Sequence, residues 1–133
     1  MGWDLHRNIF DQMISFHGPV FDRAMSALLD DLDERGLLDE TLVVAFGEMG
    51  RSPKMGGSGR NHWPSGSTFW AGGGVKRGAV IGETTEDAGE PKTKPLTAKN
   101  INATICHAAG ISTIEMAQMG VLPGSEVFHE LFA

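Results

Sequence analysis

The feature that most constrains the fold is an amphipathic segment followed, a few residues later, by a continuously apolar one. Between Pro19 and Gly36 the apolar residues recur at the spacing of one helical face: Val20, Phe21, Ala24, Met25, Leu28, Leu29 and Leu32. The run Thr41–Phe46 is apolar and rich in β-branched residues, as in strands buried on both faces of a parallel sheet. A helix leading directly into such a strand is half of a β-α-β unit. We therefore expect an α/β protein, a three-layer α/β/α sandwich with a mainly parallel sheet.

The other expected elements are shorter. Gly18-Pro19 is expected to interrupt the helical pattern, and Thr97 is a good N-cap residue for a later helix. The sequence predicts a helix over residues 8–16, a loop over 47–67, strands over 68–71 and 78–82, and helices over 98–109 and 113–118.

Charge and composition exclude several classes of function. The chain has 133 residues, 41% of them hydrophobic, which suits one ordinary globular domain. Its formal net charge is −6 and it has no basic run, so we expect no nucleic-acid partner. No stretch approaches the roughly 20 apolar residues that a membrane helix needs. The start Met1-Gly2-Trp3-Asp4 lacks the features of a secretory signal.

Three patches contain side chains that are able to bind a metal or an anion. They are Trp3-Asp4-Leu5-His6, Gly47-Glu48-Met49-Gly50-Arg51-Ser52-Pro53 and Gly59-Arg60-Asn61-His62-Trp63. The second patch follows the predicted buried strand directly. Open α/β sheets bind ligands beyond the carboxyl ends of their parallel strands, so Glu48 is expected at that edge.

Together the patches contain a plausible ligand set. Asp4, His6, Glu48 and His62 would supply two carboxylates and two imidazoles, which suit zinc, manganese or iron. The guanidinium groups of Arg51 and Arg60 would bind phosphate or sulfate through paired N–H donors. Each assignment has an alternative. Asp4 and His6 would belong to a frayed terminus, Glu48 would cap the next segment or form an exposed ion pair with Arg51, and His62 would be a structural histidine packed on Trp63.

The three motifs, in this order, resemble those of the bacterial domain of unknown function family 1501. That family shows Trp-Asp-x-His, then Gly-Glu-x-Gly-Arg-(Thr/Ser)-Pro, then Gly-Arg-Asp-His-Trp, and the likeness spans nearly all of the chain. The helix, turn and strand over residues 20–44 also resemble those of sulfatases. The resemblance implies that residues 1–133 are the C-terminal part, about one third, of one alkaline phosphatase-like α/β domain. In that superfamily, phosphate or sulfate esters are attacked beside one or two metal ions.

The resemblance also implies roles for single residues. Asp4 and His6 match the upstream ligands, Glu48 the strand-end aspartate and His62 the late histidine ligand. Two departures affect this set: Met49 stands where the superfamily has histidine or asparagine, and Asn61 replaces the family's aspartate. A thioether is a poor ligand for hard divalent ions, so one of two metal positions is expected to be lost or built differently.

We therefore expect a metal-dependent phosphate or sulfate ester hydrolase-like domain with zinc or manganese as its cofactor. Its partner would be a phosphate- or sulfate-bearing small molecule or glycan. Relatives carry the nucleophile on an earlier strand and often begin with an export signal to the bacterial envelope. The chain is accordingly expected to be a fragment that is inactive alone. The alternatives are a non-catalytic metal- or anion-binding module and a truncated product without independent function.

Overall fold

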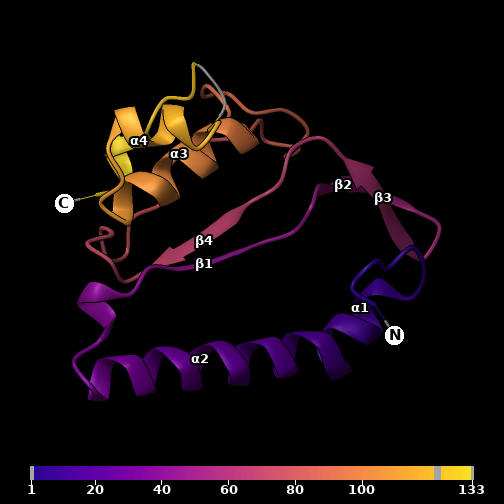
Figure 1. Cartoon of the computed structure of the whole chain (residues 1–133). Helices are drawn as coiled ribbons and strands as arrows, with labels where there is room; N and C mark the ends of the chain where they lie inside the picture. The colour runs from indigo at the N-terminus through magenta and orange to yellow at the C-terminus, as the bar shows by residue number, and fades with distance from the viewer. Residues whose placement is uncertain (1, 122–123, 133) are drawn as a thin grey trace.

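The first third of the chain is dominated by one long helical segment. In the computed structural model, which describes residues 2–121 and 124–132, it consists of α1 (Ile9–Gln12), a π-helical turn (Met13–His17) and α2 (Gly18–Glu34) (Figure 1). The predicted interruption at Gly18-Pro19 is wrong, because proline is tolerated in the first turn of a helix and Pro19 lies there in α2. The predicted end is confirmed: Gly36 has φ +68°, the left-handed conformation that terminates helices.

The strands form two separate antiparallel pairs instead of one parallel sheet. β1 (Val43–Phe46) pairs with β4 (Thr68–Ala71), and β2 (Gly50–Gly56) pairs with β3 (Gly59–Trp63). The predicted three-layer α/β/α sandwich with a mainly parallel sheet is therefore wrong. A parallel return needs a crossover that usually contains a helix, whereas the residues between β1 and β4 form the β2–β3 hairpin. The predicted loop over 47–67 contains this hairpin.

Burial along the strands also differs from the expectation. The predicted strand over 68–71 is confirmed as β4. Residues 43–45 of β1 are only half-buried, however, and Phe46 is 56% exposed, so β1 is not covered on both faces. No strand forms over residues 78–82, where Val80 is 94% exposed.

The C-terminal helices follow the predicted boundaries closely. α3 (Ala98–Ala108) begins at Thr97, whose hydroxyl accepts a hydrogen bond from the Asn100 N–H, while the Asn100 side chain accepts one from the Thr97 N–H. α4 (Thr113–Gln118) and a short 3-10 helix (His129–Leu131) follow. Buried Thr104 connects α3 to the C-terminal segment, because its hydroxyl accepts from the Phe128 N–H at 2.9 Å.

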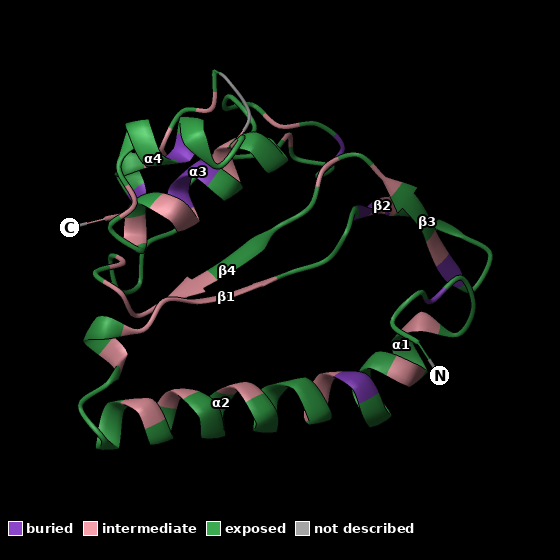
Figure 2. Ribbon diagram, viewed as in Figure 1, coloured by how far each residue is buried: buried purple, intermediate pink, exposed green. Residues whose placement is uncertain are grey.

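The buried hydrophobic residues of the described chain lie in two places (Figure 2). One surrounds α3 and contains Ala103, Thr104, Met116 and Leu131. The other lies where the N-terminal segment meets the β2–β3 hairpin and includes Leu5. Each core is small, so contacts between neighbouring segments contribute a larger share of the stability of the fold than they do in a large domain.

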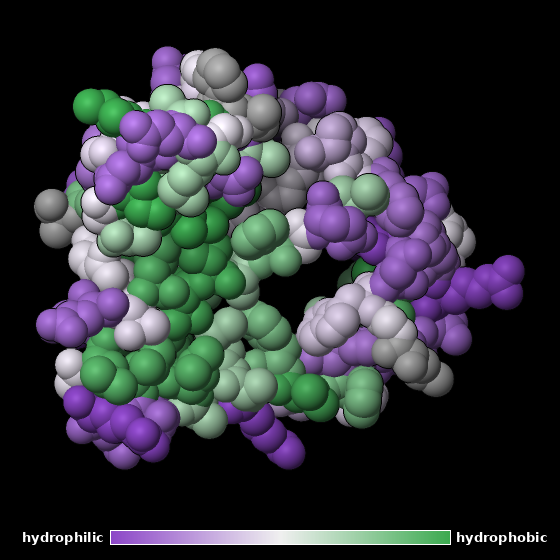
Figure 3. All heavy atoms as spheres, in the orientation of Figure 1, coloured by the Kyte–Doolittle hydropathy of each residue, from purple (hydrophilic) through white to green (hydrophobic). Residues whose placement is uncertain are grey.

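Much apolar surface stays accessible. The protein exposes 9429 Å², whereas a compact monomer of this mass exposes roughly 6800 Å². Figure 3 shows hydrophobic residues gathered on one side of the molecule, between α2 and the C-terminal helices. A hollow of about 540 Å³ lies in this region, lined by residues that include Leu29, Phe69 and Leu131. Among the described residues, no helix is both long and apolar enough to cross a membrane.

The contribution of the α4 cap to stability is predicted to depend on pH. The Ser112 hydroxyl and N–H both donate to the Glu115 carboxylate, at 2.7 and 2.8 Å, and these bonds lower the pKa of Glu115. Because its pKa is lower in the folded state, ionised Glu115 stabilises the fold above the ordinary glutamate pKa. This contribution is lost as the pH falls through the lowered value. We expect Ser112→Ala to raise the pKa of Glu115 in an NMR titration, with Ser112→Thr as the control. An unchanged pKa in Ser112→Ala would refute this account.

Candidate metal centre

The N-terminal segment is held against the turn of the β2–β3 hairpin. Leu5 is buried there, and its carbonyl accepts a hydrogen bond from the Arg60 N–H at 3.4 Å. The Asn8 N–H donates to the Ser58 hydroxyl, and the Ile9 N–H donates to the Ser58 carbonyl, both at 3.0 Å. The segment that contains Asp4 and His6 is therefore held to the hairpin at Leu5 and at Asn8 and Ile9, on both sides of His6.

Two further contacts restrict this segment. A Cβ atom at Gly59 would overlap the backbone carbonyl of His6. The close approach of the N-terminal segment and the hairpin turn therefore requires glycine at this position. On the other side, the Trp3 ring packs against buried His17, with 4.7 Å between the ring centroids. The glycine-rich stretch 56–59 is thus a hairpin turn that receives the N-terminal segment.

The register of the hairpin brings two other candidate residues together. Arg51 of β2 and His62 of β3 are directly opposite each other. Side chains at opposite positions of an antiparallel pair lie on the same face of the sheet. Arg51 and His62 therefore project together toward the N-terminal segment.

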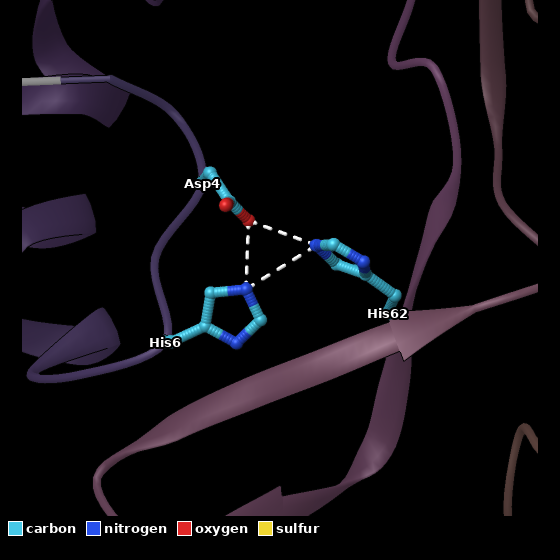
Figure 4. A group of neighbouring side chains, drawn as sticks. All are labelled: Asp4, His6 and His62. Atoms are coloured by element: carbon cyan, nitrogen blue, oxygen red, sulfur yellow. Dashed lines mark hydrogen bonds and ion pairs between the residues drawn. The ribbon is translucent and has the colours of Figure 1, made fainter.

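Asp4, His6 and His62 converge although they are distant in the sequence (Figure 4). The Asp4 Oδ1 atom lies 2.9 Å from His6 Nε2 and 3.1 Å from His62 Nε2, and the two nitrogens are 3.2 Å apart. All three side chains are exposed to solvent, at the surface between the N-terminal segment and β3. Asp4 and His62 are 58 residues apart, so only the tertiary fold creates this cluster.

Arg51 adds a positive charge to the cluster and forms an ion pair with Asp4. Its Nη2 group donates to Asp4 Oδ1, the same oxygen that faces both imidazoles, and its Nη1 group lies 3.4 Å from His6 Nε2. The hydrogen bond from Arg51, followed by that from His62, lowers the pKa of Asp4 to about 2. The Asp4 carboxyl group is consequently ionised at neutral pH, which is the form that binds a cation.

The two remaining candidates lie outside the cluster. Glu48 is 70% exposed, and its Oε1 atom lies 4.0 Å from Arg51 Nη2, so it borders the cluster only through Arg51. Arg60 donates to the carbonyls of Ser52 and Pro53, both at 2.6 Å, where the β2–β3 register shifts. Its guanidinium group satisfies carbonyls that the bulge removes from the ladder and is not directed at Asp4.

The cluster fits one divalent ion by donor type and spacing. Two imidazole nitrogens and one carboxylate oxygen suit zinc or manganese. Zinc bonds to such atoms measure about 2.0–2.2 Å, which places neighbouring donors about 3.3 Å apart in a tetrahedral site. The observed separations of 2.9, 3.1 and 3.2 Å are close to that value.

The residues that support the site carry no chemical signal in the sequence. Leu5 is an ordinary buried apolar residue. Ser58 accepts hydrogen bonds with its hydroxyl group and its backbone carbonyl, and Gly59 permits the close approach because it has no side chain. The alternation Asp4-Leu5-His6 was the available clue, because a buried residue between two polar ones places both polar side chains on the other face of an extended segment.

Comparison with known proteins adds the family. Neither the curated proteins nor the solved structures contain a significant match to this chain. A protein-family model with the description "Protein of unknown function (DUF1501)" matches residues 1–120, which include all three motifs and the whole Asp4, His6 and His62 cluster. The match covers most of the sequence, and the chain belongs to this family of proteins of unknown function.

Proposed function

We propose that Asp4, His6 and His62 bind one divalent metal ion, zinc or manganese, and that this centre serves the hydrolysis of a phosphate or sulfate ester. The observation that carries the proposal is the convergence of the three donor atoms, all within 4.8 Å of one another, from two distant segments. Glu48 is not included in this ligand set, because it does not join the cluster.

The number of protein ligands supports a catalytic centre over a purely structural one. Structural zinc sites are usually closed by four protein ligands, whereas catalytic sites use three and keep a position for water or substrate. When bound, the ion would activate a water molecule and offset negative charge on the ester. The Asp4 carboxylate would neutralise part of the ion's charge, and both imidazoles would bind it in their neutral form.

The resemblance of residues 20–44 to sulfatases, and of the family to the alkaline phosphatase superfamily, supports the reaction class, and Arg51 supports the substrate class. A guanidinium group presents a planar fork of N–H donors that matches phosphate and sulfate oxygens. Arg51 lies directly beside the proposed ion position, with only 23% of its side chain exposed. The substrate would be a small molecule or glycan that carries such an ester.

Metal titration of the purified full chain tests this proposal. After removal of metal with a chelator, we expect calorimetry to show one zinc or manganese ion bound per chain, together with a rise in the thermal unfolding midpoint. Because the chain is expected to be inactive alone, aryl phosphates and aryl sulfates then test for turnover by a longer metal-loaded form that includes the expected nucleophile strand. Absence of ion binding would overturn the whole proposal. Binding without turnover would overturn the hydrolase and favour a metal-binding module.

A further inference from the structure

We propose that Arg51 competes with the metal ion for Asp4, and that metal binding releases its guanidinium group to form a site for a tetrahedral oxyanion. This inference rests on the proposed metal centre. It adds an order of binding: the metal first creates the anion site, and a sulfate or phosphate group then enters it.

The contacts of Arg51 are those expected of a cation substitute. Its two terminal nitrogens lie within hydrogen-bonding distance of two of the three proposed ligand atoms, Asp4 Oδ1 and His6 Nε2. A divalent ion would need a lone pair on each of these same two atoms. Because the guanidinium and the ion are both positive, they would also repel each other at such short range. Arg51 and the metal therefore compete for Asp4.

The released guanidinium group remains near the centre. Arg51 is fixed in β2 opposite His62, so its backbone does not need to move. Among the described residues, Glu48 is the other acidic side chain within ion-pair distance of Arg51, with its Oε1 atom at 4.0 Å, and is exposed enough to be displaced by a ligand. A bound oxyanion would accept the paired N–H donors that no longer face Asp4.

The balance of charge favours this order. In the cluster the Asp4 carboxylate is paired with the Arg51 guanidinium group. Addition of a divalent ion leaves the same group of side chains with excess positive charge. An anionic ligand is then attracted both by the ion and by the freed guanidinium. Since linkage is reciprocal, the anion must also tighten metal binding.

Replacement of Arg51 by glutamine gives the decisive test, because its two expected effects have opposite signs. Without the competing guanidinium, Arg51→Gln should bind zinc more tightly than the wild type, by about fivefold or more. It should lose the sulfate binding that calorimetry detects in the zinc-loaded wild type. In the wild type itself, sulfate should bind at least about tenfold more weakly in the presence of a chelator than with saturating zinc.

Two further variants keep the test informative. Arg51→Lys retains the positive charge without the planar fork, so it should still weaken zinc binding relative to Arg51→Gln but bind sulfate less well than the wild type. Arg77→Gln is the matched control, because Arg77 is an exposed arginine paired with Asp39 at 3.5 Å, outside the cluster. It should leave both affinities unchanged.

The outcomes separate this inference from the proposed centre. If zinc does not bind to the wild type, the metal centre itself is wrong. If zinc binds but Arg51→Gln weakens it, Arg51 supports the ligands and does not compete with the ion. If zinc-dependent sulfate binding survives in Arg51→Gln, or sulfate binds to the wild type equally well without zinc, the anion site lies elsewhere. The last three results overturn the inference and leave the metal centre intact.

Discussion

Replacement of His62 by alanine is expected to raise the dissociation constant for zinc by about 100-fold or more. Loss of a partner that merely orients a metal ligand commonly costs 10–100-fold in affinity, so loss of a ligand itself should cost at least the upper value. His62 is also the proposed ligand that β3 contributes, whereas Asp4 and His6 come from one short segment. Calorimetric titration with zinc chloride measures the effect directly.

A stability measurement and a control variant distinguish the loss of a metal ligand from the loss of the folded structure. The His62 side chain is 48% exposed, so His62→Ala should unfold at the same temperature as the wild type when both are metal-free. His107→Ala is the control, because His107 is an exposed histidine on α3 that does not belong to the cluster. A His62→Ala protein that binds zinc with wild-type affinity would show that the ion, if any, binds elsewhere.

Replacement of Gly59 by alanine is expected to weaken zinc binding by about tenfold or more, although Gly59 offers no ligand. The added methyl group would overlap the His6 carbonyl, so the N-terminal segment must move away from the hairpin. Overpacking of this kind costs about 1–3 kcal/mol in stability. It also moves the proposed ligands Asp4 and His6 away from His62, and small displacements are costly because a metal site needs closely fixed ligands.

Gly47→Ala provides the comparison for this variant. A Cβ atom at Gly47 would lie 3.4 Å from the Met49 carbonyl oxygen, an ordinary contact, so zinc affinity should not change. Denaturant unfolding of both variants measures stability, and calorimetry measures metal affinity. If Gly59→Ala loses stability but binds zinc as the wild type does, the hairpin turn supports the fold without positioning the ligands.

The position of Glu48 shows why one of the four predicted metal ligands lies outside the cluster. Glu48 was selected because it follows an apolar strand, and ligands of open parallel sheets gather at the carboxyl ends of the strands. That rule needs neighbouring strands that end at the same edge. β1 pairs only with antiparallel β4 among the described residues, so the end of β1 lies beside the start of β4. The premise was wrong, and with it the reason to place Glu48 at a shared edge.

Pairing between strands was the least predictable part of the fold. The apolar run Thr41–Phe46 identifies a strand, but its composition does not say which strand it pairs with or in which direction. The β2–β3 hairpin was hidden within a glycine-rich stretch that contains Pro53. Pro53 lies where the register shifts, and proline is tolerated at such bulges because the ladder is already interrupted there.

The sequence alone determined the ends of several helices and showed which side chains are able to bind a metal. Helix ends depend on residues that are close together in the chain, such as Thr97 with Asn100 and the left-handed Gly36, so local physical chemistry is sufficient to locate them. The chemistry of Asp4, His6 and His62 is likewise a property of the side chains themselves.

The tertiary structure decided the sheet pairing and the membership of the cluster. Both depend on contacts between distant segments: β1 with β4, and the N-terminal segment with the turn at Ser58 and Gly59. The energy of such contacts comes from packing and hydrogen bonds that exist only after the chain has folded. For the same reason, only the folded protein reveals that Arg51 binds the very carboxylate that a metal ion would require.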